Sequence, residues 1–246
     1  MISLRKIVGV VMLCALQAAC AAATDDELIA DPYEGFNRSV HSVNKGLDQA
    51  ILRPASQAYD FVTPTLFRFL FANAISHLEL PNVFVNQVLQ GEGEEALSTL
   101  GRFAVNTVYG AAGALDPATE LGLPKESTDF GLTLASWGMP EGAYVELPLF
   151  GPSSERDAVG FLVDFVLSPT TYVSGGSEPI VQAALTAVRP VDILESRSRR
   201  GALIDDLLYR SEDSYVSVRT NYIQNRRRRV SGGETDIDDL PDLFGN

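Results

Sequence analysis

The segment 63–76 restricts the fold most strongly, because the helix that it predicts is apolar on almost every face. Pro64 follows Thr63, a pair typical of the first turn of a helix. The apolar residues of this segment are Leu66, Phe67, Phe69, Leu70 and Phe71. A helix with so little polar surface is either deeply buried or in contact with an apolar environment outside the protein.

Three more helices are predicted in the first half of the chain. Apolar residues recur at helical spacing over residues 36–51, and Pro54 is expected to end that helix. Pro81 begins a third helix, which Gly91 ends. Residues 94–108 form a fourth, with its apolar residues on one side. All of these helices are short.

The second half is divided by glycine and proline. These residues recur through 110–152 and favour turns and short helices over one long element. Ser154 and Asp157 form a capping box at the start of a further helix. Helical patterns cover residues 158–167, 179–188 and 191–218, the last with an interruption near Gly201. No alternating strand pattern persists, so the predicted fold class is all-α.

The C-terminal end combines opposite charges. Four arginines at 226–229 are followed by Gly232, Gly233 and an acidic stretch. A flexible, solvated tail over residues 221–246 is the expected structure. A docking arm for an acidic partner is the alternative.

Composition limits the partners of the chain. Its formal net charge is −13, which argues against nucleic acid and against adhesion to anionic lipid surfaces. No segment after the N-terminal region reaches the roughly 18 to 20 apolar residues of a spanning helix. Membrane association would therefore require apolar helices at an interface or a covalent anchor.

The N-terminus has the pattern of an export signal. Arg5 and Lys6 precede an apolar run at 7–16, and two alanines stand directly before Cys20. Once the signal is removed, Cys20 is the only cysteine left and cannot form an internal disulfide. Lipidation of Cys20, with palmitate among the acyl groups, would explain a lone thiol in an oxidising compartment.

An alternative remains at this end of the chain. Gln17 occupies the position where a lipoprotein signal usually has leucine, and ordinary secretion with cleavage after residues 21–23 is the other interpretation. The expected organisation is a signal peptide at 1–19, a lipidated N-terminus and tether at 20–30, a helical domain at 31–220 and the tail.

The sequence offers no clear catalytic or metal site. The only histidines are His41 and His77, and the chain has no G-x-S-x-G motif. Neither histidine has a second His, a Cys or a clustered carboxylate at metal-ligand spacing. Each is expected to have a structural or surface role, and we expect no enzyme activity, metal or cofactor.

Ordered motifs through residues 31–170 resemble the MlaA (VacJ) family of outer-membrane lipoproteins. They include DPYEGFNR at 31–38, LPNVFVN at 80–86, LQG at 89–91, GRF at 101–103, NT at 106–107, ELGLP at 120–124, DFGLTL at 129–134, WG at 137–138, GAY at 142–144, LPL at 147–149, GPS at 151–153, RDAVG at 156–160 and Asp164. The stretch 171–218 fits more loosely.

The resemblance implies both a fold and a function. The fold would be a ring-like bundle of short amphipathic and apolar helices embedded in the periplasmic leaflet of the outer membrane of a Gram-negative bacterium. Such proteins remove mislocalised phospholipids from the outer leaflet through an amphipathic channel and pass them to a periplasmic lipid-carrier protein, which maintains lipid asymmetry. They associate with trimeric outer-membrane porins.

The lipid path is expected near the glycine-rich end of the fourth helix. Its candidate lining residues are Asn106, Thr107, Tyr109, Gly110 and Gly113. Polar groups within apolar walls suit a molecule with a charged head and two apolar tails. A packed core helix with a glycine-rich turn is the alternative, and the helices between residues 61 and 89 are candidates for a membrane-facing rim.

Two other functions remain open from the sequence. A periplasmic lipid hydrolase would require an activated serine near His41 or His77. A surface spreading or adhesion factor would need no conduit.

Overall fold

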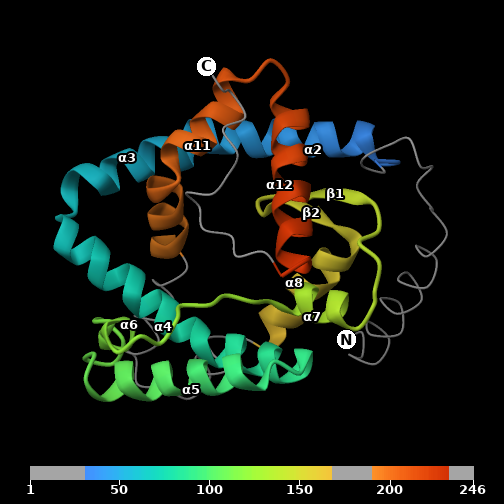
Figure 1. The fold of residues 1–246 in the computed structure, drawn as a ribbon. Helices are drawn as coiled ribbons and strands as arrows, with labels where there is room; N and C mark the ends of the chain where they lie inside the picture. Colours follow the sequence, from blue (N-terminus) through green and yellow to red (C-terminus); the bar gives the residue numbers. More distant parts are fainter. Residues whose placement is uncertain (1–30, 168–189, 233–246) are drawn as a thin grey trace, which may run out of the picture.

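The elements follow one another around a ring (Figure 1). The structure is a computed structural model that describes residues 31–167 and 190–232. The first half of the ring is entirely helical. Its elements are α2 (Glu34–Leu47), the π-helical turn η2 (Asp48–Leu52), α3 (Arg53–Val62), α4 (Thr65–Gln90) and α5 (Gly93–Val108).

The second half of the ring contains shorter elements and ends on a long helix. In Figure 1, α12 passes from the side of α2 toward α7, and it contacts both α7 and strand β2. These elements are α6 (Pro117–Glu120), α7 (Phe130–Ser136), β1 (Tyr144–Leu147), β2 (Gly151–Ser154), α8 (Glu155–Leu167), α11 (Gly201–Asp205), the π-helical turn η3 (Asp206–Arg210) and α12 (Ser214–Val230).

Two prolines that were expected to separate helices lie inside continuous helical segments. Pro54 stands in the first turn of α3, directly after η2. The π-helical turn shifts the hydrogen-bond register there, so the missing N–H of proline falls at the junction. Pro81 lies inside the 26-residue α4, where packing against α5 and α7 keeps the helix continuous. The predicted stop at Pro54 and start at Pro81 are therefore wrong.

Other predicted boundaries are confirmed. Gly91 ends α4 in the left-handed conformation at φ +82°, as expected of a glycine C-cap. The backbone N–H of Asp157 donates to Ser154 Oγ at 3.1 Å, which is one half of the predicted capping box. The helical pattern at 179–188 lies outside the described residues.

The described part of the chain is mainly helical, as predicted, but it also contains a hairpin. Strands β1 and β2 pair antiparallel, with Tyr144 opposite Ser154 and Leu147 opposite Gly151. The four-residue strands are too short for an alternating pattern to stand out in the sequence. In the described part of the chain, no helix has the length and apolar character needed to cross a membrane.

The C-terminal part has the predicted interruption near Gly201, but a second break and the continuation of the last helix beyond residue 220 were not predicted. Residues 190–199 are helical, and interruptions at 200 and 211–213 separate them from α11 and from α12. Helix α12 continues to Val230, so the expected tail boundary at 220 is wrong for residues 221–230. The side chain of Arg226 is buried among carboxylates, which holds this arginine-rich segment in the fold.

The interior is more polar than that of an ordinary globular protein. Among the described residues, buried polar and charged side chains outnumber buried apolar ones. The buried aromatic cluster is small and consists of Tyr144, Tyr215 and Ile223, with Tyr222 against it. Large apolar side chains on α3, α4 and α5 are exposed instead, including Phe61 at 92 %. This distribution, with polar residues inside and large apolar residues outside, is the inverse of the usual distribution in soluble proteins.

Candidate functional site

A cavity of about 710 Å³, here called the main cavity, lies between α2, the hairpin, the α11–η3 segment and α12. This volume falls in the range of small-molecule sites. One part of its lining is apolar: Phe150, Leu203, Ile204, Leu207, Leu208 and Val218. Another part is polar or charged: His41, Asn44, Lys45, Glu146, Arg200, Asn221, Asn225, Arg226 and Arg229. The cavity therefore presents both kinds of surface to a ligand.

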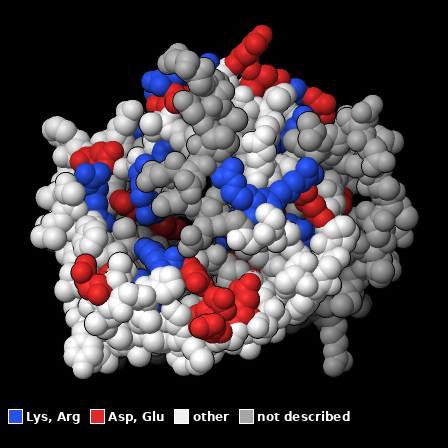
Figure 2. All heavy atoms as spheres, in the orientation of Figure 1, with Lys and Arg blue, Asp and Glu red and all other residues white. Residues whose placement is uncertain are grey.

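Two smaller cavities border the first. One of about 330 Å³ shares Ser127 with it, and one of about 170 Å³ shares Arg200. The two smaller cavities share Ser76, Glu79 and Arg199 with each other. In Figure 2, charged side chains gather toward the centre of the face that is drawn, whereas uncharged ones dominate its lower periphery. Charged side chains therefore line the cavities inside the ring.

Two cations on the cavity wall have no carboxylate partner within the described ranges. Lys45 Nζ donates to Ser214 Oγ at 3.1 Å and lies 5.6 Å from the centre of the Tyr209 ring. No ion pair of Arg200 occurs among residues 31–167 and 190–232. In a chain with a net charge of −13, unpaired cations that face a cavity favour an anionic ligand group.

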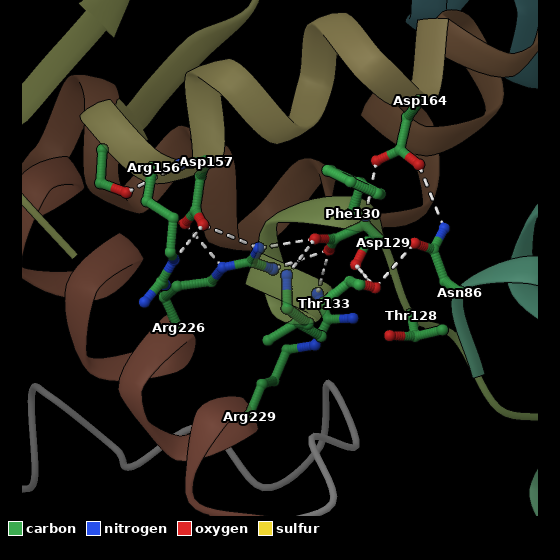
Figure 3. Close-up of polar contacts among 12 residues, drawn as sticks. Asn86, Thr128, Asp129, Phe130, Thr133, Arg156, Asp157, Asp164, Arg226 and Arg229 are labelled. Atoms are coloured by element: carbon green, nitrogen blue, oxygen red, sulfur yellow. Dashed lines mark hydrogen bonds and ion pairs between the residues drawn. The ribbon is translucent and has the colours of Figure 1, made fainter. Parts of the chain in front are cut away.

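One wall of the ring is fixed by a buried ion cluster (Figure 3). The Arg226 guanidinium bonds both oxygens of Asp129 at 2.6 and 2.7 Å and lies 2.6 Å from an oxygen of Asp157. Tyr222 also donates to Asp157. Burial disfavours the charged form of each aspartate, but the Arg226 guanidinium outweighs it and lowers the pKa of both. The cluster joins α12 to α7 and α8.

A second network in Figure 3 joins α4 to the same two helices. Asn86 donates to Asp164 Oδ1 at 3.2 Å and accepts from Thr133 Oγ1 at 2.8 Å. The other oxygen of Asp164 accepts from the backbone N–H of Phe130 at 2.9 Å. Through these contacts, Asp164 and Asn86 connect three helices.

His41 has well-defined partners inside the ring. Its Nδ1 lies 3.1 Å from Glu146 Oε1, and its Nε2 lies 3.0 Å from Ser214 Oγ. His41 and Glu146 are only 5 and 2 % exposed. Tyr144 and Asn44 donate to the same carboxylate at 3.0 and 3.3 Å.

His77 of α4 stacks on Phe103 of α5, with ring centres 4.8 Å apart. Its Nε2 lies 3.2 Å from Thr107 Oγ1, and burial lowers its pKa. In the described part of the chain, no group of three or more His, Cys, Asp or Glu could hold a metal ion.

The predicted lining residues at the end of α5 occupy different environments. Asn106 is buried, lines the 330 Å³ cavity and donates to Asp116 at 2.8 Å. Thr107 is exposed, and Tyr109 is 76 % exposed. Gly110 and Gly113 lie in a tight turn, where an added Cβ would meet backbone oxygens or the His77 ring. Of these five residues, only Asn106 borders one of the three cavities. Cys20 lies outside the described residues.

Asp116 is held in its charged form beside the smaller cavity. Burial of the carboxylate raises its pKa, but hydrogen bonds from Thr119, Asn106 and Arg102 together outweigh burial and lower the pKa to about 2. The Arg102 guanidinium binds both of its oxygens, at 2.7 and 2.8 Å. This pair fixes the end of α5 to the loop before α6.

The polar face of α2 points into the protein, which was not predicted from the sequence. Asn37, His41, Asn44 and Asp48 recur at helical spacing, and all but Asn44 are buried, whereas Phe36, Val43 and Ile51 of the apolar stripe are exposed. A polar stripe with the periodicity of a buried face was the available signal.

Comparisons with known proteins agree with one another. The family model described as MlaA lipoprotein matches residues 29–229. Proteins of *Shigella flexneri* and *Escherichia coli* K12, both named intermembrane phospholipid transport system lipoprotein MlaA, are each 33 % identical, covering 89 % of this chain and 86 % of the relative. A *Rickettsia felis* protein named only as uncharacterized is 31 % identical, over 82 % of this chain and 78 % of its own length.

The fold has a solved counterpart. A structure described as the structural basis for maintenance of bacterial outer membrane lipid asymmetry superposes with a TM-score of 0.69 at 31 % identity. The alignment covers 82 % of this chain and 99 % of the solved one. With the family model matching most of the sequence, the chain belongs to the MlaA lipoprotein family.

Proposed function

We propose that this protein transports phospholipids at the outer membrane, with its apolar outer surface in the bilayer and the lipid passing through the polar interior of the ring. The inverse polarity of the fold carries this proposal, because charged residues line the cavities and large apolar residues face outward. The names of the *Shigella* and *Escherichia* relatives and the description of the solved structure support it.

The outer surface suits a hydrocarbon environment. Phe61, Leu66, Phe67 and Phe69 are each more than half exposed at the junction of α3 and α4. Burial of one such side chain contributes about 1.5–3 kcal/mol, so burying several of them in the bilayer would strongly stabilise the membrane-bound state. Because no described helix can cross the bilayer, the protein would occupy one leaflet.

The main cavity suits an amphiphile. Lys45 and Arg200 supply positive charge for a phosphate, and Leu203, Leu207 and Val218 supply apolar surface for an acyl chain. A lipid headgroup in hydrocarbon would lose several kcal/mol for each unpaired polar group, so a charged wall lowers the barrier to its movement. A spreading or adhesion factor would not need such a cavity.

The proposal also includes the lipid anchor, the neighbouring membrane protein and the carrier that receives the lipid. Lipidation of Cys20 would hold the protein in the periplasmic leaflet, and a trimeric porin would be its neighbour in the membrane. A soluble periplasmic carrier would receive the lipid. A conduit has no energy source, so the affinity of that carrier would set the direction of net movement.

Narrowing the main cavity tests this function. Val218 lines the cavity from α12, whereas Val216, two residues earlier, is exposed and is not part of the lining. We expect Val218→Trp to reduce the transfer of fluorescent phospholipid from donor vesicles carrying the protein to acceptor vesicles at least fivefold, because the indole fills the path. Val216→Trp is the matched control and should transfer lipid at the wild-type rate.

The two variants separate the possible outcomes. Circular dichroism and thermal unfolding in detergent would verify that both variants keep the fold. If Val218→Trp is folded and transfers lipid as fast as the wild type, lipids do not pass through this cavity and the proposal is wrong.

A further inference from the structure

Ser214 lies at one end of a hydrogen-bonded chain of side chains. Its Oγ is 3.0 Å from His41 Nε2, and the opposite nitrogen of that ring is 3.1 Å from Glu146 Oε1. Lys45 Nζ lies 3.1 Å from the same Ser214 oxygen. The four residues come from α2, β1 and the first turn of α12, so only the tertiary structure brings them together.

The direction of each hydrogen bond follows from the donors and acceptors available. Glu146 is buried and already accepts from Tyr144 and Asn44, so it is satisfied as a carboxylate that also accepts from His41 Nδ1–H. The Nε2 of the same neutral ring is then an acceptor, and Ser214 donates its hydroxyl proton to it. Lys45 can only donate, and it donates to Ser214 Oγ.

This arrangement has the parts of an activated nucleophile. A base accepts the hydroxyl proton, a carboxylate fixes the tautomer of that base, and a cation lies beside the oxygen where negative charge develops. We propose that Ser214 is a nucleophile that attacks the carboxylic ester of a lipid in the main cavity, with His41 as general base and Glu146 as its positioning residue.

The Ser214 hydroxyl lies against the wall of this cavity, because His41 and Lys45, which both contact it, line the cavity. His41, Lys45 and Glu146 all line the 710 Å³ cavity, and Leu207 and Leu208 line it as well. The first three residues surround the Ser214 hydroxyl, directly or through the His41 ring. A glycerophospholipid carries its ester bonds between the phosphate and the acyl chains, so a headgroup near Lys45 would bring an ester close to Ser214.

The reaction is a hydrolysis in two steps. Ser214 Oγ forms a bond to the acyl carbon, the ester C–O bond breaks, and the proton passes through His41 to the departing lysophospholipid oxygen. Water then attacks the acyl-serine, again with His41 as base, and releases a fatty acid. Phospholipid and water thus give lysophospholipid and fatty acid, without any other reactant.

The structure also indicates that turnover is slow. The backbone N–H groups of Tyr215 and Val216 donate to Asp213 Oδ1 at 3.0 and 3.2 Å, so they are not free to bind an oxyanion. The loss of one such donor costs roughly a hundredfold to a thousandfold in rate. Lys45 is left to stabilise the oxyanion, so both the formation and the hydrolysis of the acyl-serine should be slow.

A serine-directed probe tests the proposal. The full chain in detergent micelles would be treated with a long-chain alkyl fluorophosphonate, and the labelled residue identified by peptide mass spectrometry. We expect one label per chain, on Ser214. Ser214→Ala should lose it, whereas Ser217→Ala, three residues further along α12, should keep it. An unlabelled wild type, or equal labelling of Ser214→Ala, would overturn the proposal.

The rate of labelling tests the role of Glu146, because this rate would not change if Glu146 were only a structural residue. We expect Glu146→Gln to lower the labelling rate at least a hundredfold, because the amide no longer fixes the productive histidine tautomer. Glu146→Asp should restore part of the rate, with the same circular dichroism spectrum as the wild type. Equal labelling rates in folded Glu146→Gln and wild type would exclude this role.

The proposal adds a second activity to lipid transport, and the two can fail separately. Ser214→Ala should release no fatty acid from diacylphosphatidylethanolamine vesicles, whereas Ser217→Ala, which lies outside the network and the cavity lining, should release fatty acid and transfer lipid as the wild type does. Fatty-acid release from these vesicles that is equal in the wild type and Ser214→Ala would contradict the second activity without affecting the first.

Discussion

At the scale of single residues, buried ion pairs take over much of the role that apolar contacts have in other folds. Arg226 and Arg227 are neighbours in the sequence, yet one is buried between Asp129 and Asp157 and the other is half exposed beside Glu141. A buried charge that loses its partner is far more costly than an exposed one. The two arginines should therefore respond very differently to the same substitution.

We expect Arg226→Met to lower the free energy of unfolding by about 3–5 kcal/mol, because it leaves two buried carboxylates without their cation. The melting temperature in detergent should fall by roughly 10 °C. Arg227→Met is the control, with an expected loss of less than about 1 kcal/mol. Equal melting temperatures for the two variants would mean that the buried cluster does not hold α12.

At the scale of elements, the helices turn their polar faces inward. The buried stripe of α2 consists of Asn37, His41 and the apolar Val40, and Asp48 of η2 continues it. Helix α4 begins with a turn of exposed apolar residues and becomes buried only from Ile75 onward. Its first turns therefore extend beyond the protein and require an apolar environment of their own.

Charges on the exposed start of α4 should weaken membrane binding. For Phe67→Glu with Phe69→Glu, we expect the partition coefficient onto phospholipid vesicles to fall at least about tenfold, since two half-exposed rings no longer enter the bilayer. Co-sedimentation with vesicles measures this, using a chain with Cys20→Ser so that no acyl group contributes. The Phe67→Leu, Phe69→Leu pair should bind normally. Unchanged binding of the glutamate variant would place this surface outside the membrane.

At the scale of the whole molecule, the ring combines an apolar exterior with a polar, cavity-containing interior (Figure 1, Figure 2). Such a body is unstable in water, because its exposed apolar area is far larger than the scattered apolar residues of soluble proteins. Under the proposed function, the bilayer would cover this area. The membrane would then supply the contacts that the small buried cluster does not.

The chain from residue 20 onward, with Cys20→Ser, should be monodisperse only with detergent or lipid. We expect sedimentation velocity to give one species in micelles and large, heterogeneous aggregates after the detergent is removed, because the apolar exteriors then associate. A sharp monomer peak in detergent-free buffer would show that the outer surface is covered by the protein itself.

Much of the helical framework could be predicted from the sequence. The Gly91 stop and the Ser154 capping residue depend on local chemistry, and both were found from the residues alone. The hairpin, the break at 211–213 and the π-helical turns were missed, since short strands and π-helical turns have weak local signals. The predicted lining residues are only partly near a cavity, because apolar spacing alone does not reveal which face of a helix lies inward.

By itself, the sequence determined the helical class, the lack of a spanning helix among the described residues and the family, since each depends on local pattern or ordered motifs. Only the tertiary structure decided which faces point inward and which distant side chains meet. Ion pairs such as Arg226–Asp129 join residues far apart in the chain, and the Ser214–His41–Glu146 network spans three elements. No local periodicity encodes these pairings, because they arise from ring closure, which brings α12 against α2, the hairpin and α7.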